Sequence, residues 1–112
     1  MWIGLIGIGE VRPGDIMRRA AKIDRNQVAI VQALRQIGCS VLPLHTVGHG
    51  CPDLLAARHP VGNVLLEVKD GTLAPSRRRL TPDELAFHGS WLGPVYVVES
   101  ADDAIKIMSG QK

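Results

Sequence analysis

Residues 50–71 have the sequence GCPDLLAARHPVGNVLLEVKDG, which combines two apolar runs with turn-forming residues. The runs occupy residues 54–57 and 61–66, and the dipeptides His-Pro and Gly-Asn beside them are typical of turns. This pattern predicts a β-hairpin whose turn is centred near Pro60. The other predicted elements take their places around this hairpin.

The predicted hairpin register places Asp53 directly opposite Glu67. Because side chains alternate along a strand, Glu67 and Lys69 share one face of the sheet, while Leu66 and Val68 share the other. Directly opposed side chains have Cβ atoms about 4.5–5.5 Å apart, where two carboxylates repel each other. A divalent cation together with the Lys69 ammonium would offset this repulsion, and Mg²⁺ prefers oxygen ligands. The alternative is a surface hairpin in a shifted register that carries three unrelated charges.

Pro52-Asp53 followed by Glu67-Val68-Lys69 resembles the Pro-Asp … Asp/Glu-x-Lys signature of the PD-(D/E)XK nuclease superfamily. Over residues 22–108 the wider pattern is similar to the small phage and bacterial members called VRR-NUC (virus-type replication-repair nuclease) domains. The resemblance implies a restriction-endonuclease-like core with the element order αβββαβ(α).

The same resemblance implies a metal-dependent endonuclease that hydrolyses DNA phosphodiester bonds and selects structures such as junctions, flaps or nicks. Asp53, Glu67 and the main-chain carbonyl of Val68 would hold Mg²⁺ or Mn²⁺. Lys69 would orient the attacking water or stabilise the developing oxyanion. Short relatives often form homodimers, and a homodimer would also cover a free sheet edge in a domain of this size.

A helix is predicted before the hairpin, with Asp24 as its N-cap and Gly38 at its end. Its apolar side is expected to consist of residues that recur every three positions, namely Val28, Val31, Leu34 and Ile37. Asn26 and Gln27 lie in its first turn. The resemblance brings a polar or acidic residue of this turn to the active site, where either amide would support the site through a hydrogen bond to metal-bound water. The alternative for Gln27 is a capping-box role alone.

The remaining elements indicate an α/β fold. Strands are predicted at residues 40–46 and 94–98, and Pro43 indicates that the first of them is an edge strand or carries a bulge. The crossover through a helix makes the last strand parallel to the strand that bears Glu67. We therefore expect a mixed four-stranded sheet flanked by helices on both faces, followed by a last helix capped by Ser100.

The helix of that crossover has a clear start. Thr81 is a suitable N-cap, Pro82 suits the first position, and Glu84 closes a capping box. The helix is expected to continue to about Trp91. His88 on this helix is a secondary candidate for the site, because it could point back towards the sheet.

A run of arginines follows the hairpin in the predicted loop at residues 70–80. Arg77, Arg78 and Arg79 would grip DNA phosphates, since a guanidinium offers paired donors and stays charged at any working pH. The alternative for such a run is a solvated loop. His49, in a glycine-containing loop before the hairpin, is a further candidate for contact with DNA.

Two other classes of protein stay open. Cys39, His45, His49 and Cys51 could hold zinc, although their spacing matches none of the usual zinc knuckles and small buried thiols explain the cysteines more simply. A DNA-binding module that keeps the fold but has lost cleavage is the other alternative. The presence of both carboxylates and the lysine argues against it.

The composition fits one small globular domain. The 112 residues carry a net charge of +2, with 46% hydrophobic and 21% charged residues. We expect residues 17–112 to form this domain and residues 1–16 to be a flexible arm or an extension. The apolar residues 1–9 lack a basic leading region and are too short to span a bilayer. We therefore expect no membrane contact and a cytoplasmic location, in a phage or bacterial host cell if the resemblance holds.

Overall fold

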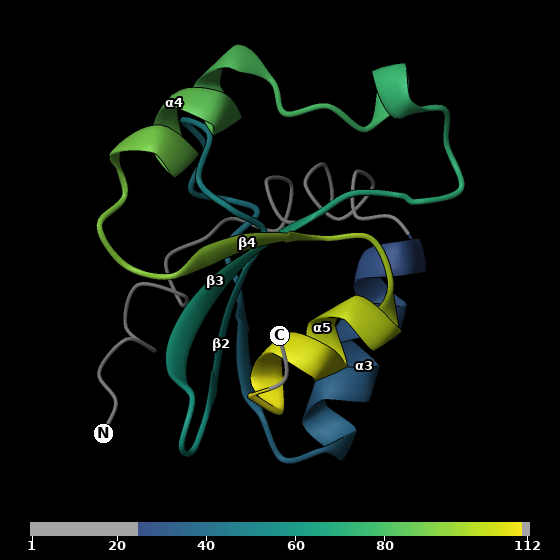
Figure 1. Cartoon of the computed structure of the whole chain (residues 1–112), viewed down its shortest axis with the longest axis vertical. Helices are drawn as coiled ribbons and strands as arrows, with labels where there is room; N and C mark the ends of the chain where they lie inside the picture. Colours follow the sequence, from purple (N-terminus) through teal and green to yellow (C-terminus); the bar gives the residue numbers. More distant parts are fainter. Residues whose placement is uncertain (1–24, 111–112) are drawn as a thin grey trace.

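The computed structural model describes residues 25–110 (Figure 1). Its elements follow the chain in the order α3 (Arg25–Gln36), β1 (Ser40–Pro43), β2 (Leu54–Arg58), β3 (Gly62–Val68), the 3-10 turn η1 (Pro75–Arg77), α4 (Pro82–Ser90), β4 (Val95–Val98) and α5 (Ala101–Met108). This is the predicted order of helix, three strands, helix, strand and helix. The Asp24 cap and the expected arm at residues 1–16 lie outside the described residues.

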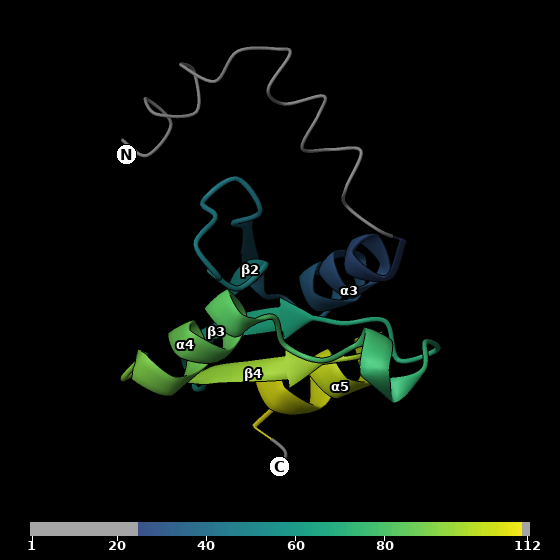
Figure 2. The same ribbon diagram turned by 90° about the horizontal axis from the view of Figure 1, so that it is seen from above.

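The four strands form one mixed sheet in the order β1-β2-β3-β4. β1 pairs antiparallel with β2, β2 pairs antiparallel with β3, and β3 pairs parallel with β4. β1 lies at one edge, as its Pro43 predicts, and β4 lies at the other. Figures 1 and 2 show α3 and α5 together on one face of the sheet and α4 on the opposite face. The predicted α/β class and mixed sheet are confirmed.

The hairpin has the predicted register. Leu54 pairs with Leu66 and Leu55 with Leu65, and the ladder continues towards the turn with the same offset. One step beyond the ladder, the same offset brings Asp53 opposite Glu67. The pairing therefore places the two carboxylates at the end of the hairpin that is distant from its turn.

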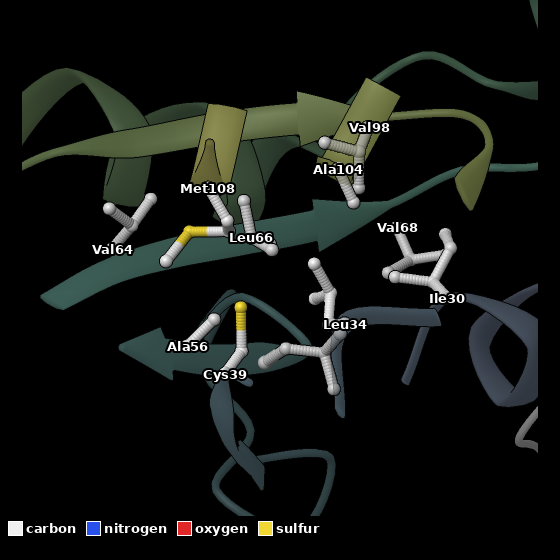
Figure 3. Close-up of a cluster of buried hydrophobic side chains, with 11 residues drawn as sticks. Ile30, Leu34, Cys39, Ala56, Val64, Leu66, Val68, Val98, Ala104 and Met108 are labelled. Carbon is white, nitrogen blue, oxygen red and sulfur yellow. The ribbon is translucent and has the colours of Figure 1, made fainter. Parts of the chain in front are cut away.

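The hydrophobic core lies between the sheet and the pair of helices α3 and α5 (Figure 3). Its members from the sheet come from one face only, and they alternate with residues of the other face. The buried core residues are Ile30, Leu34, Cys39, Leu54, Ala56, Val64, Leu66, Val68, Val98, Ala104 and Met108.

The predicted apolar side of α3 was wrong in part. Val28 is 47% exposed, whereas Ile30 and Leu34 are fully buried and Gln27 is 7% exposed. A strict three-residue spacing drifts around a helix that has 3.6 residues per turn, so Val28 rotates away from the face that holds Leu34. The buried face therefore follows the spacings of three and four residues from Gln27 through Ile30 to Leu34.

Arg58, at the end of β2, fastens both core helices to the hairpin. Its Nε donates to the main-chain oxygen of Ile37 at 2.9 Å, and its Nη1 donates to that of Met108 at 3.3 Å. These oxygens lie at the carboxyl-terminal ends of α3 and α5, where carbonyls lack helical partners and a cation is favourable. One side chain thus satisfies two helix ends.

α4 begins as the sequence predicts. Thr81 accepts a hydrogen bond from the Glu84 main chain, and the Glu84 side chain accepts one from the main chain of Thr81. The start of the helix packs closely against the loop that precedes β2: a Cβ added at Gly50 would collide with the main-chain oxygen of Asp83. No helix among residues 25–110 is long and apolar enough to cross a membrane.

Gly50→Ala is expected to loosen α4 from this loop, and Gly48→Ala is its matched control. Both glycines have φ near +78°, at 77° and 78°, so alanine is strained at either position, by about 1 kcal/mol. Only Gly50 has a backbone against it, since no atom lies within 4 Å of a Cβ at Gly48. Chemical denaturation should show Gly50→Ala destabilised more than Gly48→Ala, by about 1–3 kcal/mol. Equal losses would contradict a tight contact here.

Candidate active site

Three polar residues of the hairpin meet on the face of the sheet that α4 covers. Glu67 and Lys69 alternate with the core residues of β3, and Lys69 Nζ lies 3.9 Å from Glu67 Oε2. Asp53 is fixed from the neighbouring strand, because its Oδ2 accepts the main-chain N–H of Val68 at 2.8 Å. The carboxylates and the lysine named from the sequence therefore form one cluster.

Glu67 is a buried carboxyl group in an acidic setting. Its side chain is only 3% exposed. Burial, a side-chain hydrogen bond with Asp53, and the negative charges of Asp53 and Glu84 raise the pKa of Glu67 to about 9, against a smaller opposing effect of Lys69. In the protein alone the cluster therefore holds a proton at neutral pH that a bound cation would displace.

α4 contributes two further residues to the cluster. Glu84 Oε1 accepts a hydrogen bond from Lys69 Nζ at 2.7 Å and also closes the capping box with the Thr81 N–H at 2.9 Å. Burial by itself would raise the pKa of Glu84, but the hydrogen bonds from Lys69 and Thr81 outweigh it and the pKa is lowered. The sequence indicated Glu84 only as a cap. The signal that could have indicated its contact with Lys69 is the crossover connection, which places α4 over a face of the sheet.

His88 points back towards the sheet, as its position on the helix suggested. Its side chain is 13% exposed, and its Nε2 lies 3.9 Å from Glu67 Oε1. Both of these atoms are buried, and neither has a hydrogen-bond partner within residues 25–110. His88 and Glu84 are four residues apart and so share one side of α4.

The residues present fit a hard divalent cation. Asp53 and Glu67 offer two adjacent carboxylates, and the buried Glu67 Oε1 has no donor in the part of the chain that is described. Mg²⁺ takes one or two carboxylates of this kind and fills its other positions with water and phosphate oxygens. No group of three or more His, Cys, Asp and Glu side chains suited to a metal occurs in the described ranges.

The zinc alternative gains no support from this arrangement. Cys39 belongs to the hydrophobic core, and it joins no metal-binding group with His45, His49 and Cys51 in the described chain. Cys51 lies near the carboxylates instead. Burial, then the charges of Glu67 and Asp53, raise the pKa of the Cys51 thiol, which favours its neutral form.

The two amides of α3 have different surroundings. Asn26 Nδ2 donates to the main-chain oxygens of Lys69 at 2.7 Å and Glu99 at 3.2 Å. The Asn26 side chain therefore ties the ends of β3 and β4 together, and it holds the backbone that carries Lys69. Gln27 is buried at 7% exposure.

The three arginines divide into two kinds. Arg78 Nη1 pairs with Glu99 Oε2 at 2.9 Å, and its Nε donates to the main-chain oxygen of Leu73 at 2.8 Å. Arg78 thus holds the loop in place, which the sequence did not reveal because Glu99 lies on another element. Arg77 and Arg79 are exposed, and His49 is exposed in a left-handed backbone conformation with φ of 57°.

Comparison with known proteins finds no matching family model, no matching curated protein and no matching solved structure.

Glu67 should make the metal-free protein less stable as pH rises. Its pKa in the folded protein, about 9, lies above its ordinary value of 4.5, so the folded state binds more protons between these values. This contribution to stability is complete below about pH 4.5 and is lost progressively as pH rises towards 9, by at most about 1.4 kcal/mol per pH unit.

Urea denaturation in EDTA at pH 5.5–8.5 measures this loss. Glu67→Gln should flatten the fall, because glutamine cannot ionise. Asp102→Asn, at an exposed position, should keep the wild-type slope. If Glu67→Gln loses stability with pH as steeply as the wild-type protein, Glu67 is not the group that titrates.

Proposed function

We propose that this protein is a Mg²⁺- or Mn²⁺-dependent endonuclease that hydrolyses DNA phosphodiester bonds. The observation that supports it most is the convergence of Asp53, Glu67 and Lys69 on one face of the sheet, with the carboxylates paired by the hairpin register. The element order and mixed sheet are compatible with a restriction-endonuclease-like core, which remains part of the proposal.

In this proposal Asp53, Glu67 and the main-chain carbonyl of Val68 hold the cation. When bound, the cation supplies Lewis-acid activation of water and neutralises charge on the phosphate. The Val68 N–H holds the Asp53 carboxylate in position beside Glu67. The buried Glu67 carboxyl group would supply a second ligand oxygen in its ionised form.

Lys69 orients the attacking water or stabilises charge on the phosphate oxygens. Two contacts fix where its ammonium lies. Glu84 accepts a hydrogen bond from Nζ, and Asn26 holds the main-chain oxygen of the same residue. A catalytic group held from both ends loses little orientational freedom when the substrate binds.

In this proposal the DNA phosphates contact exposed side chains of two loops, one after β3 and one before β2. Arg77 and Arg79 are exposed on the loop after β3, and His49 is exposed on the loop before β2. Arg78 supports this surface from within the loop through Glu99. Junctions, flaps and nicks are the proposed substrates, as the resemblance implies.

A homodimer is also part of the proposal. β4 is an edge strand in the described sheet, and Tyr96 and Val97 on it are 42% and 41% exposed. An edge strand of this apolar character is usually covered by another chain or by charge. Pairing of β4 with β4 of a second copy would cover this edge and join the two sheets into one.

Cleavage assays test the proposed chemistry. Asp53→Ala and Glu67→Ala should abolish Mg²⁺- and Mn²⁺-dependent nicking of plasmid DNA and cutting of junction and flap substrates. Lys69→Ala should lower the rate by at least about 100-fold. All three variants should fold, because none of these side chains belongs to the hydrophobic core between the sheet and the helices α3 and α5. Wild-type rates in either carboxylate variant would refute the assignment. A wild-type protein that binds DNA without cutting it would support the non-cleaving module instead.

The salt dependence of DNA binding separates the two kinds of arginine. Replacing Arg77 and Arg79 together by alanine should reduce the log–log salt slope by about 0.9 for each lost phosphate contact. Their loss should leave the melting temperature nearly unchanged, since exposed charges contribute little to folding. Arg78→Ala is the matched control: it should lower the melting temperature through the loss of the Glu99 pair and keep most of the slope. An unchanged slope in the double variant would show that Arg77 and Arg79 do not contact DNA phosphates and are simply solvated.

A further inference from the structure

Two aromatic side chains at the end of α4 form a stacked pair outside the hydrophobic core. The ring centroids of Phe87 and Trp91 lie 5.1 Å apart, with an angle of 16° between the ring planes. Trp91 is 47% exposed, and α4 buries none of its residues against the described part of the chain. The core lies on the opposite face of the sheet, against α3 and α5 (Figures 1 and 2). Core packing therefore does not explain the pair, and large exposed apolar side chains often mark a binding surface.

The position of the Trp91 indole is fixed from several sides. Its main-chain N–H donates to the main-chain oxygen of Phe87 at 2.9 Å, which holds Trp91 at the end of the helix. Gly93 passes close to the ring, since a Cβ added there would lie 3.0 Å from Nε1 of Trp91. A side chain that is already held in place loses little conformational freedom when a ligand stacks on it.

The stacked pair lies next to the candidate active site. Glu84, His88 and Trp91 are spaced by four and three residues, so they follow one side of α4. Glu84 contacts Lys69, and the His88 side chain faces Glu67. Trp91 comes three residues after His88, which is about 4.5 Å along the helix axis. That distance is close to the length of one nucleotide, about 3.4 Å along a strand of B-DNA.

An exposed aromatic ring beside a phosphate-binding site suits an unpaired nucleobase. Every base has a flat face that stacks on an aromatic side chain, and proteins that bind single strands combine such rings with positive charge along the backbone. Here the exposed Arg77 and Arg79 precede α4, and Trp91 lies at its other end. The bases of an intact duplex are stacked on one another and cannot reach the ring.

We propose that the Phe87–Trp91 pair is a stacking site for an unpaired nucleobase next to the phosphate at the candidate site. The inference rests on the proposed function, because it names the part of the DNA that selects the substrate. A flap has unpaired bases at its branch point, whereas a nicked duplex is paired on both sides of the nick. The pair therefore makes a flap the better substrate, and Trp91 is a specificity-determining residue that takes no part in the chemistry.

Binding of two flap DNAs in EDTA, where no cutting is expected, tests this inference. The two DNAs have the same duplex arms and the same number of phosphates, but the flap nucleotides carry thymine in one and no base in the other. Fluorescence anisotropy should show that wild type binds the thymine flap about 5–100-fold more tightly. Trp91→Ala should reduce this preference to near unity. Trp91→Phe should keep most of it, because phenylalanine also stacks.

Leu92→Ala is the matched control for the loss of an exposed apolar side chain. Leu92 is the neighbour of Trp91 and is fully exposed, so its loss should keep the wild-type preference. Equal binding of the two flaps by wild type would overturn the inference, and this comparison needs no variant to fold. A folded Trp91→Ala protein that keeps the preference would also overturn it. If that variant changes only its sedimentation coefficient, the pair belongs to an interface between two copies and the inference is again wrong.

Plasmid nicking separates this inference from the proposed function. A wild-type protein that cuts DNA but binds both flaps equally refutes the stacking site and leaves the nuclease proposal intact. A protein that prefers the thymine flap but cuts no DNA supports the stacking site within the non-cleaving module. A protein that neither binds nor cuts DNA refutes both proposals.

Discussion

The antiparallel pairing of β2 with β3 determines what both faces of the sheet can do. With Leu54 opposite Leu66, every second residue of the hairpin enters the core against α3 and α5. The residues between them must then face α4, and these include Glu67. A shift of one residue in the pairing would turn Glu67 towards the core and would expose Leu66 and Val68. The strong preference for burying leucine and valine therefore also holds two carboxylates together.

That arrangement carries an electrostatic cost which α4 reduces only in part. Glu84 and His88 add one more acid and one imidazole above the buried carboxyl group, and Lys69 is shared between the two glutamates. The Lys69 ammonium lies closer to Glu84, at 2.7 Å, than to Glu67, at 3.9 Å. Lys69 therefore offsets the negative charge of Glu84 more than that of Glu67. An ionised Glu67 would need a further positive charge beside it. This imbalance is the physical basis for expecting a cation.

Local patterns were enough to predict most of the fold. The hairpin register, the capping box of α4, the edge position of β1 and the parallel β4 all followed from turn residues, caps and alternation within short segments. The apolar side of α3 was predicted less well, because Val28 and Ile30 are both good core residues and only the sheet decides between them.

The contacts that could not be predicted join elements far apart in the chain. Asn26 reaches Lys69 and Glu99, and Arg78 reaches Glu99, but nothing in the sequence near Asn26 or Arg78 specifies these partners. The candidate site shows the same division. Asp53, Glu67 and Lys69 follow from one hairpin, whereas Glu84 and His88 enter only when the crossover helix has a definite position above the sheet.

Glu84 Oε1 accepts hydrogen bonds both from the main chain of Thr81 and from Lys69. The first turn of α4 and the lysine are therefore coupled through one oxygen. Fraying of a helix end requires less free energy than unfolding of the whole domain. When that turn opens, the ammonium loses its anchor while β3 and the core stay in place. While that turn is open, Lys69 is without its hydrogen bond to Glu84, so the opening of one helix end affects the candidate site before the fold is lost.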